Sequence, residues 1–101
     1  MTPSTTVEFI DAIREKHHLD SDGKVSRLLG VTRSAISTHR NGKNFFDDER
    51  AIKAAVLLEL DPGYVLACIH AERTKRPQVR DAWEKIARGL YLPAHANAAD
   101  W

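Results

Sequence analysis

Five histidines and one cysteine are the side chains of this 101-residue chain best suited to metal binding or nucleophilic chemistry. His17 and His18 are adjacent, and Cys68 and His70 are two residues apart, so on a helix each pair points to different faces. No pair has the spacing of three or four that lets two helical ligands share a metal, and no CxxC motif occurs. The sequence also lacks a glycine-rich phosphate loop and the signature of an activated serine. We therefore expect no enzyme, no metal site, no other cofactor and no small-molecule substrate.

A different chemistry, the binding of a polyanion, is indicated by the segment 24–46. It carries Lys24, Arg27, Arg33, Arg40 and Lys43 and no acidic residue, although the net charge of the whole chain is only +1. Residues 1–23 carry five acidic and two basic residues instead. This asymmetry favours a polyanion-binding surface, and the alternative is a solvated face that pairs with acids from elsewhere in the chain. A face that serves only solubility usually mixes both signs, which speaks for the first interpretation.

The elements that must position this segment are predicted to be helices, because apolar residues recur mostly at intervals of three and four. The fold class is therefore all-α, a compact bundle of five to six helices. We expect these helices at 6–18, 23–29, 33–41, 48–59, 62–73 and 77–91. Their N-caps are expected at Thr5 or Thr6, Ser21 or Asp22, Thr32, Asp47 and Asp61, and proline in the first turn strengthens the start at 62. Gly30 is expected to end the second helix in a left-handed conformation.

The apolar periodicity also predicts which side chains face the core. The expected inward residues are Phe9, Ile10, Ile13 and His17, then Val25, Leu28 and Leu29, then Ala35, Ile36 and His39, then Ile52, Ala55, Val56 and Leu57, and finally Val65, Leu66 and Ile69. One of Phe45 and Phe46 is expected to fill the core from the loop at 43–46. Cys68 is interpreted as a small core residue and not as a nucleophile.

Two short helices joined by Gly30-Val31-Thr32 must cross steeply, and such a pair can present its second helix to a DNA groove. Val25, Leu29, Val31 and Ile36 are expected to close a small core between them, and Ser26 is small where they approach. The outward positions are left to short polar or basic residues.

The residues Leu29-Gly30-Val31-Thr32, Ala35-Ile36-Ser37 and Arg40-Asn41-Gly42-Lys43 resemble the Cro/repressor-like helix-turn-helix family, also called the xenobiotic-response-element type. The resemblance extends loosely over 6–60, and Asp61–Arg73 with Trp83 is similar to small regulators of phages and prophages. Ser26 and His39 depart from the alanine and the aliphatic or aromatic residue that are usual there. The resemblance implies a lambda-repressor-like fold and a phage or prophage transcriptional repressor. Such a repressor would bind operator DNA as a homodimer through a recognition helix at 33–41, with the helix-turn-helix at 24–41.

Each position in this arrangement predicts a role. Base contacts are expected from Arg33, Ser34, Ser37 and Thr38, and phosphate contacts from Lys24, Thr32, Arg40, Asn41, Lys43 and Asn44. Arg27 and Arg40 have an alternative, which is to pair with an acid such as Asp47.

Two further features of the C-terminal half leave alternatives open. The stripe Val79, Trp83, Ile86 and Leu90 suits either the intramolecular core or a dimer interface. The basic group Arg73, Lys75, Arg76 and Arg80 suits either an additional phosphate contact or a solvated corner.

The domain organisation expected from the length is one helical DNA-binding domain over 1–92 and a flexible tail over 93–101. A single cysteine excludes an intramolecular disulfide, and neither a signal peptide nor a membrane span is recognisable, so we expect a cytoplasmic protein without a membrane partner. The rival hypothesis is a protein-interaction module, such as an antitoxin or adaptor, with weak or no DNA binding.

Overall fold

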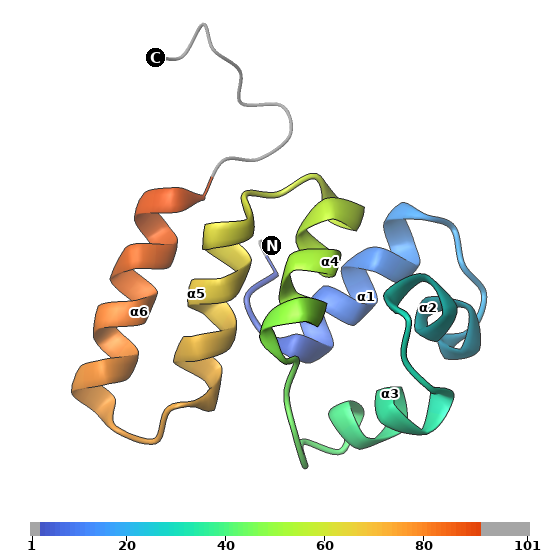
Figure 1. Cartoon of the computed structure of the whole chain (residues 1–101), viewed down its shortest axis with the longest axis horizontal. Helices are drawn as coiled ribbons and strands as arrows, with labels where there is room; N and C mark the ends of the chain where they lie inside the picture. Colours follow the sequence, from blue (N-terminus) through green and yellow to red (C-terminus); the bar gives the residue numbers. More distant parts are fainter. Residues whose placement is uncertain (1–2, 92–101) are drawn as a thin grey trace, which may run out of the picture.

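The computed structural model describes residues 3–91, and this part of the chain is all-α, as predicted (Figure 1). Its helices are α1 (Thr6–Lys16), α2 (Asp22–Leu29), α3 (Arg33–Arg40), α4 (Asp48–Leu58), α5 (Pro62–Arg73) and α6 (Pro77–Leu90). None of these helices is long and apolar enough to cross a membrane. The predicted tail at 93–101 lies outside the described residues, as do residues 1, 2 and 92 of the predicted domain.

The first five helices, α1 to α5, begin at the predicted caps, because each cap side chain accepts a hydrogen bond from an otherwise unpaired backbone N–H group in the first turn. The capping residues are Thr5, Ser21, Thr32, Asp47 and Asp61. Gly30 ends α2 in the left-handed conformation, with φ 72°. The helix α1 ends at Lys16, two residues earlier than predicted, and His18 follows with φ 53°.

The core gathers around α1, which packs against α2, α3 and α4. Its largest fully buried side chains include Phe9, Ile10, Ile13, Leu29 and Phe46, so Phe46 is the loop aromatic that fills the core, whereas Phe45 is half-buried. The buried Thr6 ties three segments together. Its backbone N–H and hydroxyl donate to Glu72 of α5 at 2.9 and 2.7 Å, and its hydroxyl oxygen accepts from the Phe46 N–H at 3.2 Å.

The buried face of α4 differs from the prediction. Ala51, Ala54, Ala55 and Leu58 are buried, whereas Ile52 and Val56, predicted to face inward, are 44% and 67% exposed. The helix lies between α1 and α5, and its alanines let both neighbours approach closely. His17 is likewise exposed, with its Nε2 atom 2.8 Å from the Leu57 carbonyl oxygen.

The helix α6 lies at the edge of the molecule and packs along α5 (Figure 1). Of the predicted stripe, Trp83 is half-buried and stacks on His70 with ring centroids 4.7 Å apart. Val79, Ile86 and Leu90 are 39%, 48% and 37% exposed, and the buried residue of this helix is Ala87. The core interpretation is therefore wrong for these three residues, and the interface interpretation stays a prediction.

Candidate nucleic-acid interface

The helices α2 and α3 are joined by three residues, and hydrogen bonds fix the backbone conformation of this turn. The N–H groups of Gly30 and Val31 donate to the carbonyl oxygens of Arg27 and Ser26 at 3.3 and 3.0 Å, which closes the end of α2. The Thr32 hydroxyl then accepts from the Ala35 N–H at 3.0 Å and starts α3. Ser26 is buried where the two helices approach, and its hydroxyl donates to the Gly23 carbonyl oxygen at 2.6 Å. This turn fixes the direction in which α3 leaves α2.

The outer side of α3 carries the four predicted base-contact residues. Arg33, Ser34 and Ser37 are exposed, and Thr38 is half-buried, whereas Ile36 on the inner side is fully buried. The Thr38 hydroxyl donates to the Ser34 carbonyl oxygen at 3.0 Å. The part of the Thr38 side chain that is available to contact a partner is therefore mainly its methyl group. The structure therefore brings a guanidinium, two hydroxyls and a methyl group together on one exposed helix face.

Five of the six predicted phosphate-contact residues are exposed and flank this face. Thr32 lies at the start of α3, Asn41, Lys43 and Asn44 follow its end, and Lys24 lies in the first turn of α2. The Thr32 hydroxyl already serves as the cap of α3, and Lys24 forms an exposed ion pair with Asp20 at 3.0 Å. Lys43 is the one cation among the residues that follow α3 at 41–46.

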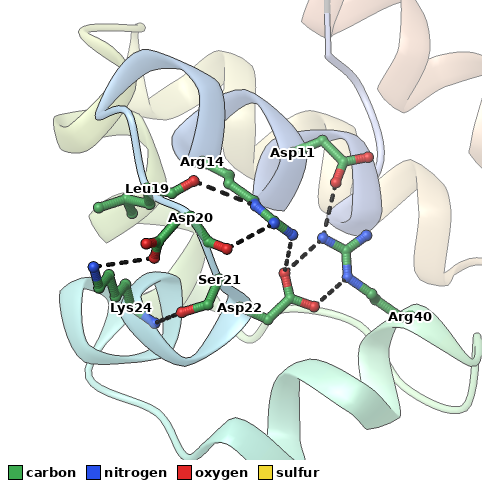
Figure 2. A network of polar contacts seen from close by, with 8 residues as sticks. All are labelled: Asp11, Arg14, Leu19, Asp20, Ser21, Asp22, Lys24 and Arg40. Atoms are coloured by element: carbon green, nitrogen blue, oxygen red, sulfur yellow. Dashed lines mark hydrogen bonds and ion pairs between the residues drawn. The ribbon is translucent and has the colours of Figure 1, made fainter.

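Arg40 is the exception among these six, because it forms ion pairs within the protein (Figure 2). Its Nε atom donates to Asp22 Oδ2 at 2.7 Å, and one terminal nitrogen donates to Asp22 Oδ1 at 2.9 Å and to Asp11 Oδ1 at 2.8 Å. The hydrogen bonds from Arg40 keep the pKa of Asp22 below its ordinary value. The alternative of an intramolecular ion pair therefore applies to Arg40, but its partners are Asp22 and Asp11 and not Asp47, and this correction removes Arg40 from the free cations of the segment.

The same cluster extends to Arg14, which sequence reasoning did not single out (Figure 2). Arg14 donates to Asp22 Oδ1 at 3.3 Å and to the carbonyl oxygens of Leu19 and Asp20 at 3.4 and 3.0 Å. These bonds hold the loop between α1 and α2 and place Asp22 within reach of Arg40. The sequence did contain a signal for these ion pairs, namely the excess of acidic residues in 1–23 directly before the basic segment. Oppositely charged residues that are close in sequence often form ion pairs.

The C-terminal end of α3 is supported from the core. His39 is buried, as predicted for a packing residue, and meets Phe46 edge to face with ring centroids 5.3 Å apart. Its Nδ1 atom lies 3.2 Å from the Asn44 carbonyl oxygen. The loop that carries Asn41, Lys43 and Asn44 is thus tied to α3 by this ring.

The cations of the basic segment fall into two groups within residues 3–91. Arg40 and Lys24 are paired with acids, and Arg27, Arg33 and Lys43 form no ion pair with a described residue. In the second basic group, Arg73 pairs with Asp48 at 3.0 Å and Arg80 donates to the Thr74 carbonyl oxygen at 3.0 Å. An additional phosphate contact and a solvated corner both stay predictions for this group.

The side chains considered for other chemistry are not assembled into a site in the described part of the chain. Residues 3–91 contain no cluster of three or more His, Cys, Asp or Glu that could hold a metal. Cys68 is buried, and its burial raises the pKa of the thiol. It therefore lies in the core as predicted, as a thiol and not as a reactive thiolate.

Residues 3–91 thus form an all-α fold in which the described C-terminal helices leave the polar and cationic outer face of α3 uncovered. Over 89 residues it is 30% identical to Gp-c, an uncharacterized protein of Pseudoalteromonas phage PM2, and the match spans 84% of this chain and 97% of Gp-c. The chain therefore belongs to the same family as this phage protein. No protein-family model and no solved structure matches the chain.

Proposed function

We propose that the chain is a sequence-specific DNA-binding transcriptional regulator in which α2 and α3 form a helix-turn-helix. The observation that carries this proposal is the outer face of α3, where Arg33, Ser34 and Ser37 are exposed and no acidic side chain lies among them. The helix packs chiefly against α1 and α2, while α5 and α6 lie on the other side of α4 (Figure 1). A helix that protrudes in this way has the shape and the charge to enter a major groove.

The roles of the side chains follow from their placement. Arg33 donates two hydrogen bonds to O6 and N7 of a guanine, and Ser34 and Ser37 donate to or accept from neighbouring base edges. The Thr38 methyl group packs on a thymine methyl, since its hydroxyl is bonded to Ser34. Lys43 and Asn44, beyond the end of α3, bind phosphates and set the register of the helix in the groove.

The proposed mode of action is repression of a phage or prophage promoter. A homodimer presents two α3 helices to successive major grooves, about 34 Å apart, on a pseudo-palindromic operator. Its binding blocks RNA polymerase where operator and promoter overlap. The family shared with a phage protein is compatible with this proposal.

The ion pairs of the structure limit how strongly binding depends on salt. If Arg27 and Lys43 are the cations that meet phosphates while Arg33 contacts a base edge, each chain displaces about two counterions. The slope of log K against log salt concentration is then about −1.8 per chain and about −3.6 for a dimer. All five cations of the segment would instead give about −9 for a dimer, so a titration from low to high salt measures how many cations are engaged.

The experiment that tests the function is selection of binding sites from randomised duplex DNA, followed by affinity measurements on the selected site. Arg33→Ala should lose roughly 1–3 kcal/mol of specific binding free energy and relax the preference at one base pair. Arg88→Ala removes the same charge from an exposed position in the last turn of α6 and serves as the matched control. If no sequence is enriched, or if Arg33→Ala binds DNA as Arg88→Ala does, the proposal that α3 is the recognition helix is wrong.

A second candidate function is a protein-interaction module such as an antitoxin or adaptor. It is favoured by the exposed apolar side chains Ile52, Val56, Val79, Ile86 and Leu90. A gel shift with random DNA separates the two candidates, because a DNA-binding protein shifts duplex at low salt and releases it at high salt. An absence of any shift, independent of salt, favours the interaction module.

A further inference from the structure

One side of the layer formed by α4, α5 and α6 is unusually apolar for a surface. The large hydrophobic side chains that are exposed in residues 3–91 are Ile52, Val56, Val79, Ile86 and Leu90. All five belong to α4 or α6, the two helices that flank α5 (Figure 1). Hydrophobic residues scattered singly over a surface need no explanation, but a set confined to two helices does.

The contacts of His70 show that the two stripes lie on the same side of this layer. His70 of α5 reaches Asp48 of α4, with Nε2 3.2 Å from Oδ1, and at the same time stacks on Trp83 of α6 at 4.7 Å. Residues three, four or seven apart on a helix share a face. Ile52 and Val56 therefore lie on the side of Asp48, and Val79, Ile86 and Leu90 on the side of Trp83.

Together these residues form one surface, here called the α4–α6 face, with the half-buried Leu66, His70 and Trp83 as its floor. Its length is that of α6, whose 14 residues span about 21 Å. Three helices about 9 Å apart give it a width of about 20 Å, hence a projected area on the order of 400 Å² before corrugation is counted. Specific stable interfaces begin near 1,200 Å² in total, or about 600 Å² on each partner. The projected area of the α4–α6 face is below this value, so a dimer formed through it is expected to be weak and concentration-dependent.

We propose that the α4–α6 face is the surface through which two copies of this chain dimerise. A twofold interface places the same patch on both partners, so it must be self-complementary. Within α6, Val79 and Ile86 alternate with the exposed Ala82 and Gly89 along the outer side. When two α6 helices cross antiparallel about a point between Ala82 and Ile86, Val79 faces the partner's Gly89 and Ile86 faces the partner's Ala82. Each large side chain then meets a small one, which is the arrangement that lets helices interdigitate.

The charges around the face also suit a second copy. Asp48, at the edge of the face, forms an ion pair with Arg73 at 3.0 Å, and the His70 Nε2 atom lies 3.2 Å from the same carboxylate oxygen. The acid on this side of the layer is thus already neutralised by its own arginine, which suits a second copy of the same surface better than a strongly acidic or basic partner. Because α3 packs against α1 and α2, a copy seated on the α4–α6 face leaves both α3 helices uncovered. This inference deepens the proposed function, and it rests on that proposal for the role of the dimer.

The test is sedimentation of the full chain without DNA, at concentrations from about 1 to about 200 µM, because the dimer fraction follows mass action. The wild type should approach twice the 11.4 kDa of one chain. Val56→Glu on α4 and Ile86→Glu on α6 should each weaken the dimer at least tenfold, since each buries an unpaired charge next to its twofold mate. The matched control is Gln78→Glu, which introduces the same charge at an exposed polar position of α6 and should leave the dimer unchanged. Circular dichroism confirms the fold of each variant, and Val56→Ser and Ile86→Ser replace any glutamate variant that does not fold.

Three outcomes overturn the proposal. The first is a wild type that stays monomeric over the whole concentration range. This outcome overturns the proposal even if the monomer binds a different protein through the α4–α6 face. The second is a dimer that neither variant weakens, and the third is a dimer that only one of the two variants weakens, since the interface requires both helices. Arg33→Ala should dimerise as the wild type does. A wild type that dimerises but does not bind DNA refutes the proposed function alone. A wild type that stays monomeric and binds DNA refutes this inference alone.

Discussion

Replacing Arg40 by alanine tests whether the ion-pair cluster beneath α3 holds that helix in place. The Arg40 guanidinium contacts both oxygens of Asp22, at 2.7 and 2.9 Å, and one oxygen of Asp11 at 2.8 Å. These acids belong to α2 and α1, so a single side chain joins the end of α3 to both other helices of this half of the molecule. Arg40→Ala removes all three hydrogen bonds at once.

The expected magnitude follows from exposure and geometry. Hydrogen bonds to charged groups contribute about 1.5–3 kcal/mol net, whereas exposed ion pairs contribute about 0–1 kcal/mol. Arg40 and Asp22 are 29% and 26% exposed, which places this bidentate pair between the two cases, and Asp11 is 59% exposed and adds little. Asp22 also keeps Arg14 at 3.3 Å in the variant, so it is not left without a partner. We expect Arg40→Ala to lower the free energy of unfolding by about 1–2 kcal/mol.

Urea denaturation followed by circular dichroism measures this loss, with Lys16→Ala as the control. Lys16 forms a single long-range ion pair with Glu59 at 3.2 Å, and the two side chains are 38% and 68% exposed. Its removal should therefore change the free energy of unfolding by no more than about 0.5 kcal/mol. If Arg40→Ala costs no more than Lys16→Ala, the cluster does not hold α3, and the reasoning from burial and bidentate geometry is refuted.

The effect should also depend on pH in a defined direction. Asp22 has its pKa lowered chiefly by the hydrogen bonds from Arg40, so the pair stabilises the fold at pH values above the ordinary carboxyl value of 3.8. The stabilisation is lost as the pH falls below 3.8, when the folded carboxylate takes up its proton. The difference between wild type and Arg40→Ala should accordingly be full at pH 6 and shrink toward pH 2, and a difference that grows on acidification contradicts the assignment.

Three other substitutions probe the elements that position α3, and each is measured by the same denaturation assay. Phe46→Ala should cost about 3–5 kcal/mol, because the ring is fully buried against His39, and a loss below 1 kcal/mol would show that the loop repacks. Gly30→Ala should cost about 1–2 kcal/mol through its φ of 72° alone, since a Cβ there meets no atom within 4 Å, and an unchanged stability would mean that the turn adopts another backbone. Thr32→Ala should cost about 1 kcal/mol by removing the cap of α3, whereas Ser37→Ala on the exposed face should cost far less.

Local chemistry explains why the helix starts were predictable. A serine, threonine or aspartate cap acts on backbone groups two or three residues away, so Ser21, Thr32 and Asp47 could be read without knowledge of the fold. Gly30 was predictable for the same reason, since the left-handed turn is a property of its own backbone. The outward polar face of α3 followed from the helical period between these signals.

The buried face of α4 could not be read in this way. The residues from Ala51 to Leu58 are apolar except for Lys53, so the helical period selects no single face. The choice is made by the neighbours, because α1 and α5 approach closely only over alanines, and the larger Ile52 and Val56 are left outside. The partners of Arg40 were missed for a similar reason, since Asp11 and Asp22 become its neighbours only when three helices have packed.

The position of α3 depends on polar contacts at both of its ends more than on its own core. The helix has eight residues and contributes Ile36 and His39 to the buried set, which is little apolar area for an element that must hold one orientation. Its start is fixed by Gly30 and Thr32, and its end by Arg40 and by His39 against Phe46. The charge of Arg40 is thus engaged in ion pairs within the fold. Arg33, at the opposite end of α3, has no ion pair with a described residue. A protein that kept both arginines free would carry a more cationic surface, but the helix presenting that surface would be held less firmly.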